Sequence, residues 1–126
     1  MKAKLYSTRA YDLDRFKPAP NYLILDTQGW VLTLCGGDDA VEGLNILRQM
    51  IVDRDDTRTF IEGRYHLGEA YLRMPVPSVA SARKWLMEAM GLIVGDEKAG
   101  RPVDPDLKAK IESSLSRLRG PSASDK

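Results

Sequence analysis

The side chains best suited to acid–base, nucleophilic or metal chemistry are isolated in this sequence. His66 is the only histidine and Cys35 the only cysteine among the 126 residues. A lone histidine is seldom a catalyst or a metal ligand, and nothing beside Cys35 would activate its thiol. No acid–base pair or nucleophile–base pair occurs at usable spacing, so we expect no catalytic residues and no cofactor. The sequence therefore predicts a protein that is not an enzyme.

One acidic run resembles the start of a calcium-binding loop. It begins at Asp53 and includes Asp55 and Asp56. The sixth position of such a loop needs glycine for a sharp turn, and the twelfth needs a bidentate glutamate. Arginine occupies both positions here, as Arg58 and Arg64. We therefore expect no metal site.

Composition excludes several classes of partner. The formal net charge is +1, with 43% hydrophobic and 29% charged residues. This balance provides no global field for nucleic acid, so no nucleic-acid partner is expected. No apolar run approaches the roughly 20 residues that span a bilayer, which predicts no membrane insertion. The first residues do not resemble a signal peptide, so the chain as written is expected to be cytoplasmic.

Hydrophobic periodicity predicts an all-α domain over residues 1–120. Apolar stripes with helical spacing indicate helices at 3–14, about 39–52, 57–74, 79–93 and 104–119. Asp104 and Pro105 supply a cap and a first helical residue for the last of these helices. Gly120 and Pro121 end it, and residues 121–126 are expected to be a disordered tail.

The segment 21–34 allows two interpretations. Two short apolar runs, at 22–25 and 30–34, flank a glycine-containing turn and could form a β-hairpin. Alternatively, Asn21 caps a helix that places Leu25, Gly29 and Leu32 on one face. Because a helix-pair pattern recurs along the chain, we expect the helix.

That recurring pattern resembles the tetratricopeptide repeat family. In the second unit, Leu67, Gly68 and Tyr71 match the first helix of the family's repeat, and the second helix is matched by Ala82, Leu86 and Ala89. In the first unit the matching residues are Gly29, Ala40 and Leu44, and in an N-terminal half unit Ala3 and Ala10. The segments around Trp30 and Tyr65 are also similar to the C-terminal repeats of bacterial lipoproteins associated with exosortase and exopolysaccharide loci.

The resemblance implies a right-handed stack of about two and a half helix pairs. Its units would be a half repeat at 3–14, repeats at 21–53 and 57–94, and a capping helix at 104–119. The family's inner helix faces form a concave groove for a partner peptide or helix. Carried over to this chain, the groove positions are Leu23, Asp26, Trp30, Thr33, Glu62, Tyr65, Glu69 and Arg73.

Two binding functions are consistent with such a stack. The preferred one is a protein-interaction scaffold whose acidic groove residues suit a neutral or basic partner. The alternative is a self-associating structural module, in which the unpaired helix 3–14 mediates a homodimer. Trp30 is expected either to bind the partner or to pack against residues 3–16.

Overall fold

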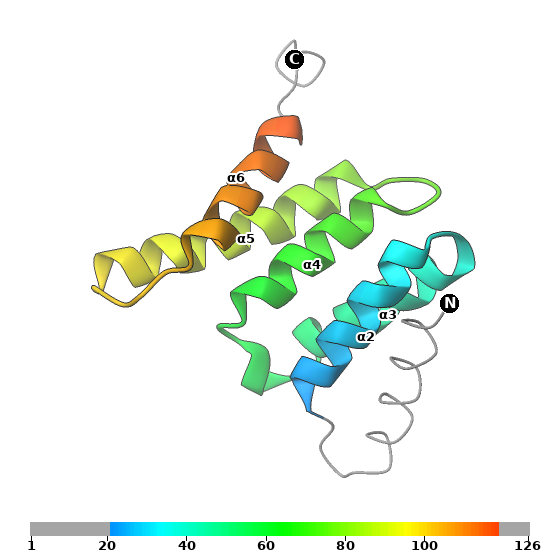
Figure 1. The fold of residues 1–126 in the computed structure, drawn as a ribbon, viewed down its shortest axis with the longest axis horizontal. Helices are drawn as coiled ribbons and strands as arrows, with labels where there is room; N and C mark the ends of the chain where they lie inside the picture. The colour runs from blue at the N-terminus through cyan, green and yellow to red at the C-terminus, as the bar shows by residue number, and fades with distance from the viewer. Residues whose placement is uncertain (1–20, 119–126) are drawn as a thin grey trace.

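The computed structural model describes residues 21–118, and every regular element in this part of the chain is helical (Figure 1). The helices are α2 (Tyr22–Cys35), α3 (Gly37–Val52), the short 3-10 helix η1 (Asp55–Thr57), α4 (Ile61–Leu72), α5 (Val79–Lys98) and α6 (Pro105–Leu118). The predicted all-α class is confirmed, and the hairpin alternative for residues 21–34 is wrong. The expected helix 3–14, with its homodimer surface, and the tail 121–126 lie outside the described residues.

Three helices begin at side-chain caps that the sequence indicates. The Asn21 side chain accepts a hydrogen bond from the Leu23 N–H at 2.7 Å, and the Ser78 side chain accepts one from Ser81. Asp104 accepts the N–H of Asp106 at 2.9 Å, just ahead of Pro105. Each cap satisfies a backbone donor that has no partner within its helix. At Asn21, the cap explains why a segment rich in strand-forming residues becomes α2.

Two predicted helix boundaries need correction. The helix expected from residue 57 begins at Ile61, because Thr57 belongs to η1 instead. The Thr57 hydroxyl donates to the Met50 carbonyl at 2.8 Å, and the Thr57 carbonyl accepts from Arg64 at 2.7 Å. The helix expected to stop near residue 93 continues to Lys98, since Gly95 lies within α5 in open space and requires no break.

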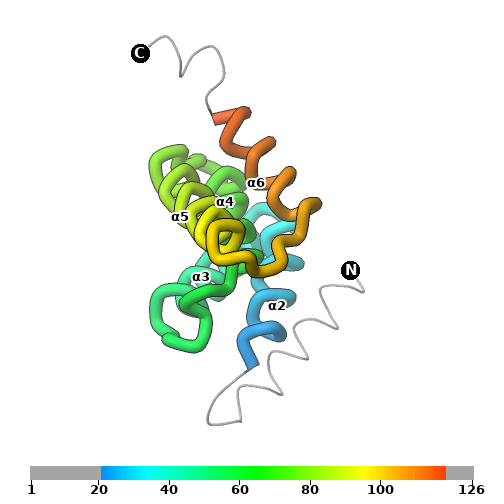
Figure 2. Tube along the Cα trace, turned by 90° about the vertical axis from the view of Figure 1, so that its left-hand side faces the viewer, coloured from blue at the N-terminus to red at the C-terminus, as the bar shows by residue number. Residues whose placement is uncertain are grey.

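The helices pack as consecutive pairs. α2 packs on α3, α4 packs on α5, and α6 packs mainly on α5. α4 lies in the middle and contacts each of the other four α-helices (Figure 1). In the view turned by 90°, α3 and α5 lie toward one side, whereas α2 and α6 lie toward the other (Figure 2). Residues on α2, α4 and α6 can therefore contribute to one face.

The two helix pairs cross at equivalent glycines. A Cβ at Gly29 would lie 2.7 Å from the Leu47 Cγ, and a Cβ at Gly68 would lie 2.7 Å from the Leu86 Cγ. Both members of this contact recur after 39 residues. The same shift relates Gly43 to Ala82, whose backbone carbonyl faces Gly68. The structural equivalent of Ala82 is therefore Gly43, not Ala40. The equivalent of Leu86 is Leu47, not Leu44 as the motif resemblance implied.

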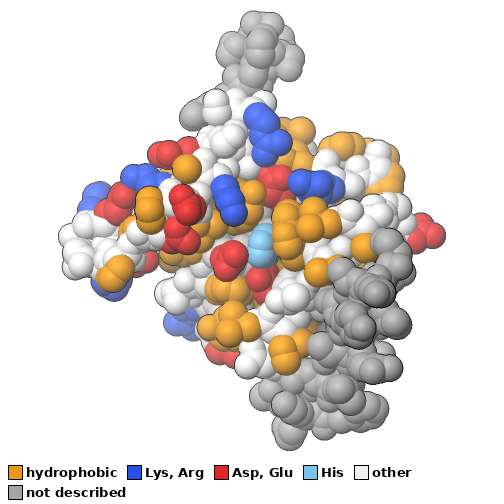
Figure 3. Space-filling view, in the orientation of Figure 1, with side chains coloured by type: hydrophobic (Ala, Val, Ile, Leu, Met, Phe, Trp, Pro, Cys, Tyr) orange, Lys and Arg blue, Asp and Glu red, His pale blue; other side chains and the backbone are white. Residues whose placement is uncertain are grey.

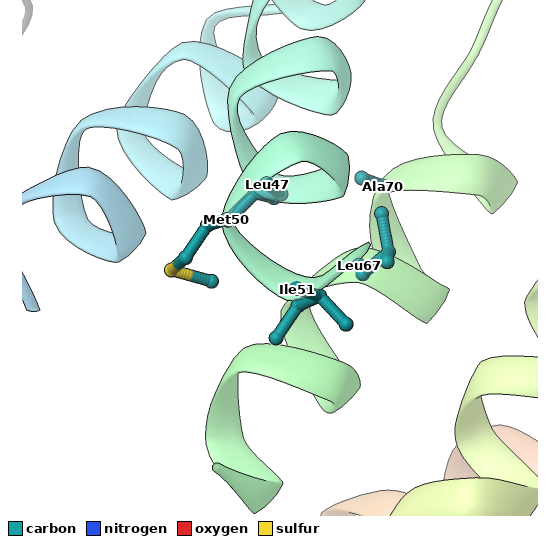
Figure 4. Packing of buried hydrophobic residues seen from close by; sticks show 5 residues of the cluster. All are labelled: Leu47, Met50, Ile51, Leu67 and Ala70. Carbon is teal, nitrogen blue, oxygen red and sulfur yellow. The ribbon is translucent and has the colours of Figure 1, made fainter. Parts of the chain in front are cut away.

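Two apolar cores hold the pairs together. The first joins α3 to α4 through buried side chains, shown in Figure 4: Leu47, Met50, Ile51, Leu67 and Ala70. The half-buried Trp85 packs against this core from α5. The second core joins α5 to α6 through Leu86, Ala89, Ile93, Ile111 and Leu115. Ile111 and Leu115 belong to the predicted stripe of the last helix.

Alanine substitutions at two helical glycines should change stability in opposite directions. A Cβ at Gly43 would lie 2.5 Å from the Gly29 carbonyl oxygen and 2.7 Å from the Thr33 backbone nitrogen, so α2 and α3 would have to separate. Gly43→Ala should lower the free energy of unfolding by about 1–3 kcal/mol. A Cβ at Gly91 would lie in open space, so Gly91→Ala should raise the free energy of unfolding by about 0.5–1 kcal/mol. Urea denaturation of both variants checks this; equal effects would contradict the close crossing of α2 and α3.

Candidate functional site

The eight predicted groove residues divide into an accessible set and a buried set. Leu23, Glu62 and Arg73 are exposed, and Trp30 and Tyr65 are half-buried. The buried residues are Asp26, Thr33 and Glu69. The expectation that all eight face a partner is therefore wrong for the last three.

Thr33 faces the neighbouring helix, not a groove. Its hydroxyl donates to the Gly29 carbonyl at 2.8 Å within α2, and its backbone lies against Gly43 of α3. The 39-residue shift that relates the glycine crossings pairs Arg73 with Leu34, whose exposed fraction is 53%. The groove position that the family resemblance assigned to Thr33 therefore corresponds to Leu34.

Asp26 and His66 form a buried pair that links α2 to α4. The His66 Nδ1 lies 2.8 Å from the Asp26 Oδ1, and both side chains are about one-tenth exposed. This contact holds the imidazole in one orientation, with Nδ1 toward Asp26. The other ring nitrogen, Nε2, lies 4.0 Å from the Glu62 carboxylate. The pair therefore determines the position of the His66 ring beneath the surface.

The fixed His66 ring supports an aromatic cluster. The Trp30 indole stacks on it with ring centroids 4.3 Å apart and an interplanar angle of 20°. Tyr65 lies beside both rings, 6.3 Å from Trp30 and 5.7 Å from His66. The Arg73 guanidinium carbon is 5.6 Å from the Trp30 ring centroid, within cation–π range. We call Trp30, Tyr65 and His66 the aromatic platform.

Glu69 connects the platform helix α4 to α6. Its buried carboxylate accepts hydrogen bonds from the Ser114 hydroxyl and from the Arg117 Nη2, the latter at 3.1 Å. The Arg73 Nε is 4.0 Å from its other oxygen. Burial, followed by the negative charge of Glu69, raises the pKa of the Tyr65 phenol above its ordinary value. Tyr65 therefore stays neutral and keeps its hydroxyl hydrogen at physiological pH.

These side chains gather on one face of the molecule. In the space-filling view, the only histidine of the chain lies among hydrophobic and acidic side chains, with Lys or Arg side chains farther along the same face (Figure 3). We call the accessible part of this region the platform face, and it comprises Leu23, Trp30, Glu62, Tyr65, Arg73 and Arg117.

Sequence reasoning missed three residues that shape this face. They are His66, Ser114 and Arg117. Ser114 lies three residues after Ile111, so it interrupts the apolar stripe of α6 with a polar side chain. A buried hydroxyl must find a hydrogen-bond partner, so a serine within this stripe was a signal of a buried polar contact. Nothing local indicated that the partner would be Glu69, 45 residues earlier.

The Asp26–His66 pair orients an imidazole, as a carboxylate does in many acid–base sites. The outer ring nitrogen, Nε2, lies 4.0 Å from the Glu62 carboxylate. Within residues 21–118, no three His, Cys, Asp or Glu side chains gather as metal ligands. The arrangement presents rigid aromatic and charged side chains.

A separate cavity lies on α3 and shares no residue with the platform face. Its volume is about 230 Å³, and its lining residues are Asn45, Arg48, Gln49, Val52 and Asp53. These side chains are mostly polar and exposed.

None of the helices within residues 21–118 has the length and apolar character needed to cross a membrane.

Comparison with known proteins finds no family model that matches the chain, and no curated protein or solved structure that is significantly similar to it. The function of this chain must therefore be inferred from the geometry of α2, α4 and α6, together with the resemblance to the tetratricopeptide repeat family.

Proposed function

We propose that this protein is a non-enzymatic protein-interaction module whose platform face binds a peptide or helix of a partner. The observation that carries the proposal is the aromatic platform. Trp30 and Tyr65 remain partly exposed, although a buried Asp26–His66 pair and a stacking contact fix their position. Tryptophan, tyrosine and arginine dominate the binding energy of protein interfaces, and Arg73 adjoins the two aromatics.

The polar pair below the platform also supports a binding role. A buried carboxylate–histidine pair adds little stability compared with apolar side chains of the same size. It does fix a ring orientation, and a rigid aromatic surface loses less conformational entropy when a ligand binds. The Asp26–His66 pair therefore has a clear use in a binding surface and little use in a core.

A tetratricopeptide-like stack is the architecture that we propose for this module. Its support is the repeated crossing of Gly29 with Leu47 and of Gly68 with Leu86, together with an apolar stripe on α6 suited to end an array. The period of 39 residues exceeds the family's usual 34. The likeness to exosortase-associated lipoproteins supports a partner in bacterial exopolysaccharide or secretion machinery.

Loss of the aromatic surface should weaken peptide binding strongly without unfolding the chain. Peptides would be selected on the wild-type protein from a random 12-residue display library, and their affinities measured by fluorescence anisotropy. The double variant Trp30→Ala, Tyr65→Ala should bind them at least tenfold more weakly, because interface aromatics typically contribute about 1.4 kcal/mol or more each.

Met87→Ala is the matched control, since Met87 is an exposed apolar residue on α5, outside the platform face. Its affinity should match that of the wild type. Thermal denaturation verifies that both variants fold. A folded double variant with wild-type affinity would show that the peptides bind elsewhere, and the proposed function would be wrong.

A further inference from the structure

We propose that the partner segment carries an acidic side chain whose carboxylate binds between the guanidinium groups of Arg73 and Arg117. This inference rests on the proposed function and names the chemistry of its ligand. It also reverses the sequence-based expectation of a neutral or basic partner. That expectation rested on three acidic residues, Asp26, Glu62 and Glu69.

Two of these three carboxylates already make hydrogen bonds inside the protein. Asp26 pairs with His66 at 2.8 Å, and Glu69 accepts hydrogen bonds from Ser114 and Arg117. Both acidic side chains are buried. Only Glu62 remains exposed, and it lies near the beginning of α4, whereas Arg73 follows the end of that helix. The part of the platform face nearest Arg73 and Arg117 therefore has no accessible acidic side chain among the predicted groove residues.

The two arginines retain unused donors. Their side chains are 47% and 63% exposed for Arg73 and Arg117, respectively. Arg73 approaches Glu69 only to 4.0 Å, beyond hydrogen-bonding distance, and Arg117 uses only its Nη2 atom for Glu69 and Ser114. Each guanidinium has five N–H donors, so most of them have no hydrogen-bond partner within residues 21–118.

The local charges also favour an additional anion. Arg73 and Arg117 flank the single carboxylate of Glu69, which leaves one formal positive charge in excess. A second carboxylate could accept paired hydrogen bonds from either guanidinium, the geometry in which arginine binds carboxylates best. The Trp30 ring beside Arg73 restricts that guanidinium before the ligand arrives.

The aromatic platform specifies what lies next to the acidic residue. Trp30 is adjacent to both Arg73 and Tyr65, so a neighbouring apolar side chain of the ligand would pack on these rings. The expected ligand is therefore an extended peptide with an aspartate or glutamate beside an apolar residue.

The test uses the display library described above, with the carboxyl terminus of every peptide fused to the display protein. Selection then reports side-chain carboxylates and not a free terminus. We expect the selected peptides to share an acidic residue at a constant position. Arg73→Gln and Arg117→Gln should each weaken binding about five- to tenfold, whereas Arg83→Gln, an exposed arginine on α5, should leave it unchanged within about twofold.

Two further measurements separate ligand binding from a structural role. Replacing the acidic residue of the peptide by its amide should remove the effect of the arginine variants. Glu69→Gln removes the competing negative charge but retains an oxygen that can accept from Ser114, so it should strengthen binding of the acidic peptides severalfold. A purely structural role for Glu69 predicts weaker binding instead.

Each other outcome has a definite meaning. Neutral or basic peptides that are lost with Trp30→Ala but not with either arginine variant would overturn this inference and leave the proposed function intact. Peptides that are unaffected by Trp30→Ala would overturn both. Sedimentation that shows a dimer dependent on Trp30 would mean that a second copy of the chain occupies the face, which also overturns the acidic-peptide assignment.

Discussion

A chain truncated after residue 103 should lose much of its free energy of unfolding. Ile111 and Leu115 of α6 are almost fully buried against Leu86, Ala89 and Ile93. Burial of two such side chains contributes about 3–6 kcal/mol. The truncation would also remove Ser114 and Arg117 and so deprive the Glu69 carboxylate of its hydrogen bonds. The loss is comparable to the whole stability of a small domain, about 5–15 kcal/mol.

Urea and thermal denaturation measure this effect, and a chain truncated after residue 120 is the control. That shorter truncation retains α6 and should denature like the full chain. Exposure of Leu86 and Ile93 should in addition make the 1–103 chain prone to aggregate. An equally stable, monomeric 1–103 chain would contradict the role of α6 as the cover of the second core.

Leu47→Ala should be much more destabilising than Leu44→Ala, although the two leucines are one turn apart on α3. Leu47 is fully buried, lies in the first core and closes over Gly29, so its truncation leaves a cavity at the α2–α3 crossing. We expect a loss of about 3–5 kcal/mol. Leu44 is only partly buried at the edge of that core, and its loss should cost about half as much or less.

The comparison is made by urea denaturation at constant pH. It also tests the equivalence of Leu47 with Leu86, because the motif alignment assigned the corresponding position to Leu44. A larger loss for Leu44→Ala would support that alignment and contradict the structure.

Local signals were sufficient to predict the helices. Asn21, Ser78 and Asp104 each cap a helix through a short-range hydrogen bond that residue type and position indicate. The wrong predictions for the start of α4 and for the end of α5 also have local causes. Thr57 makes its hydrogen bond to Met50 instead of capping a helix, and Gly95 is tolerated inside one.

The packing register of the first helix pair could not be predicted. α3 has two small residues, Ala40 and Gly43, on the same face one turn apart, and both are buried. Either could be the point where α2 crosses. Only the contact of Gly43 with the Gly29 carbonyl and Thr33 distinguishes them. That contact depends on the position of another helix, which residue spacing does not specify.

At the candidate site, too, individual residues were expected from the sequence, whereas contacts between distant segments were not. Trp30, Tyr65 and Arg73 were expected from the resemblance to the tetratricopeptide repeat family, whose groove positions were carried over to this chain. The polar contacts around them were missed because each joins distant segments, 40 residues apart for Asp26 and His66 and 48 apart for Glu69 and Arg117. These contacts changed the expected charge of the partner, since they bury two of the three acidic residues on which that expectation rested.

The most direct test of the platform face uses the two tryptophans of the chain. Trp30 belongs to the aromatic platform, whereas Trp85 packs against the first core beside Lys84. A selected peptide would be titrated into ¹⁵N-labelled protein while the two indole N–H signals are followed by NMR. Binding at the platform face predicts a saturable shift of the Trp30 signal and a Trp85 signal that stays in place. An unchanged Trp30 signal in the presence of saturating peptide, with shifts confined to the α3 cavity around Arg48 and Gln49, would contradict the account.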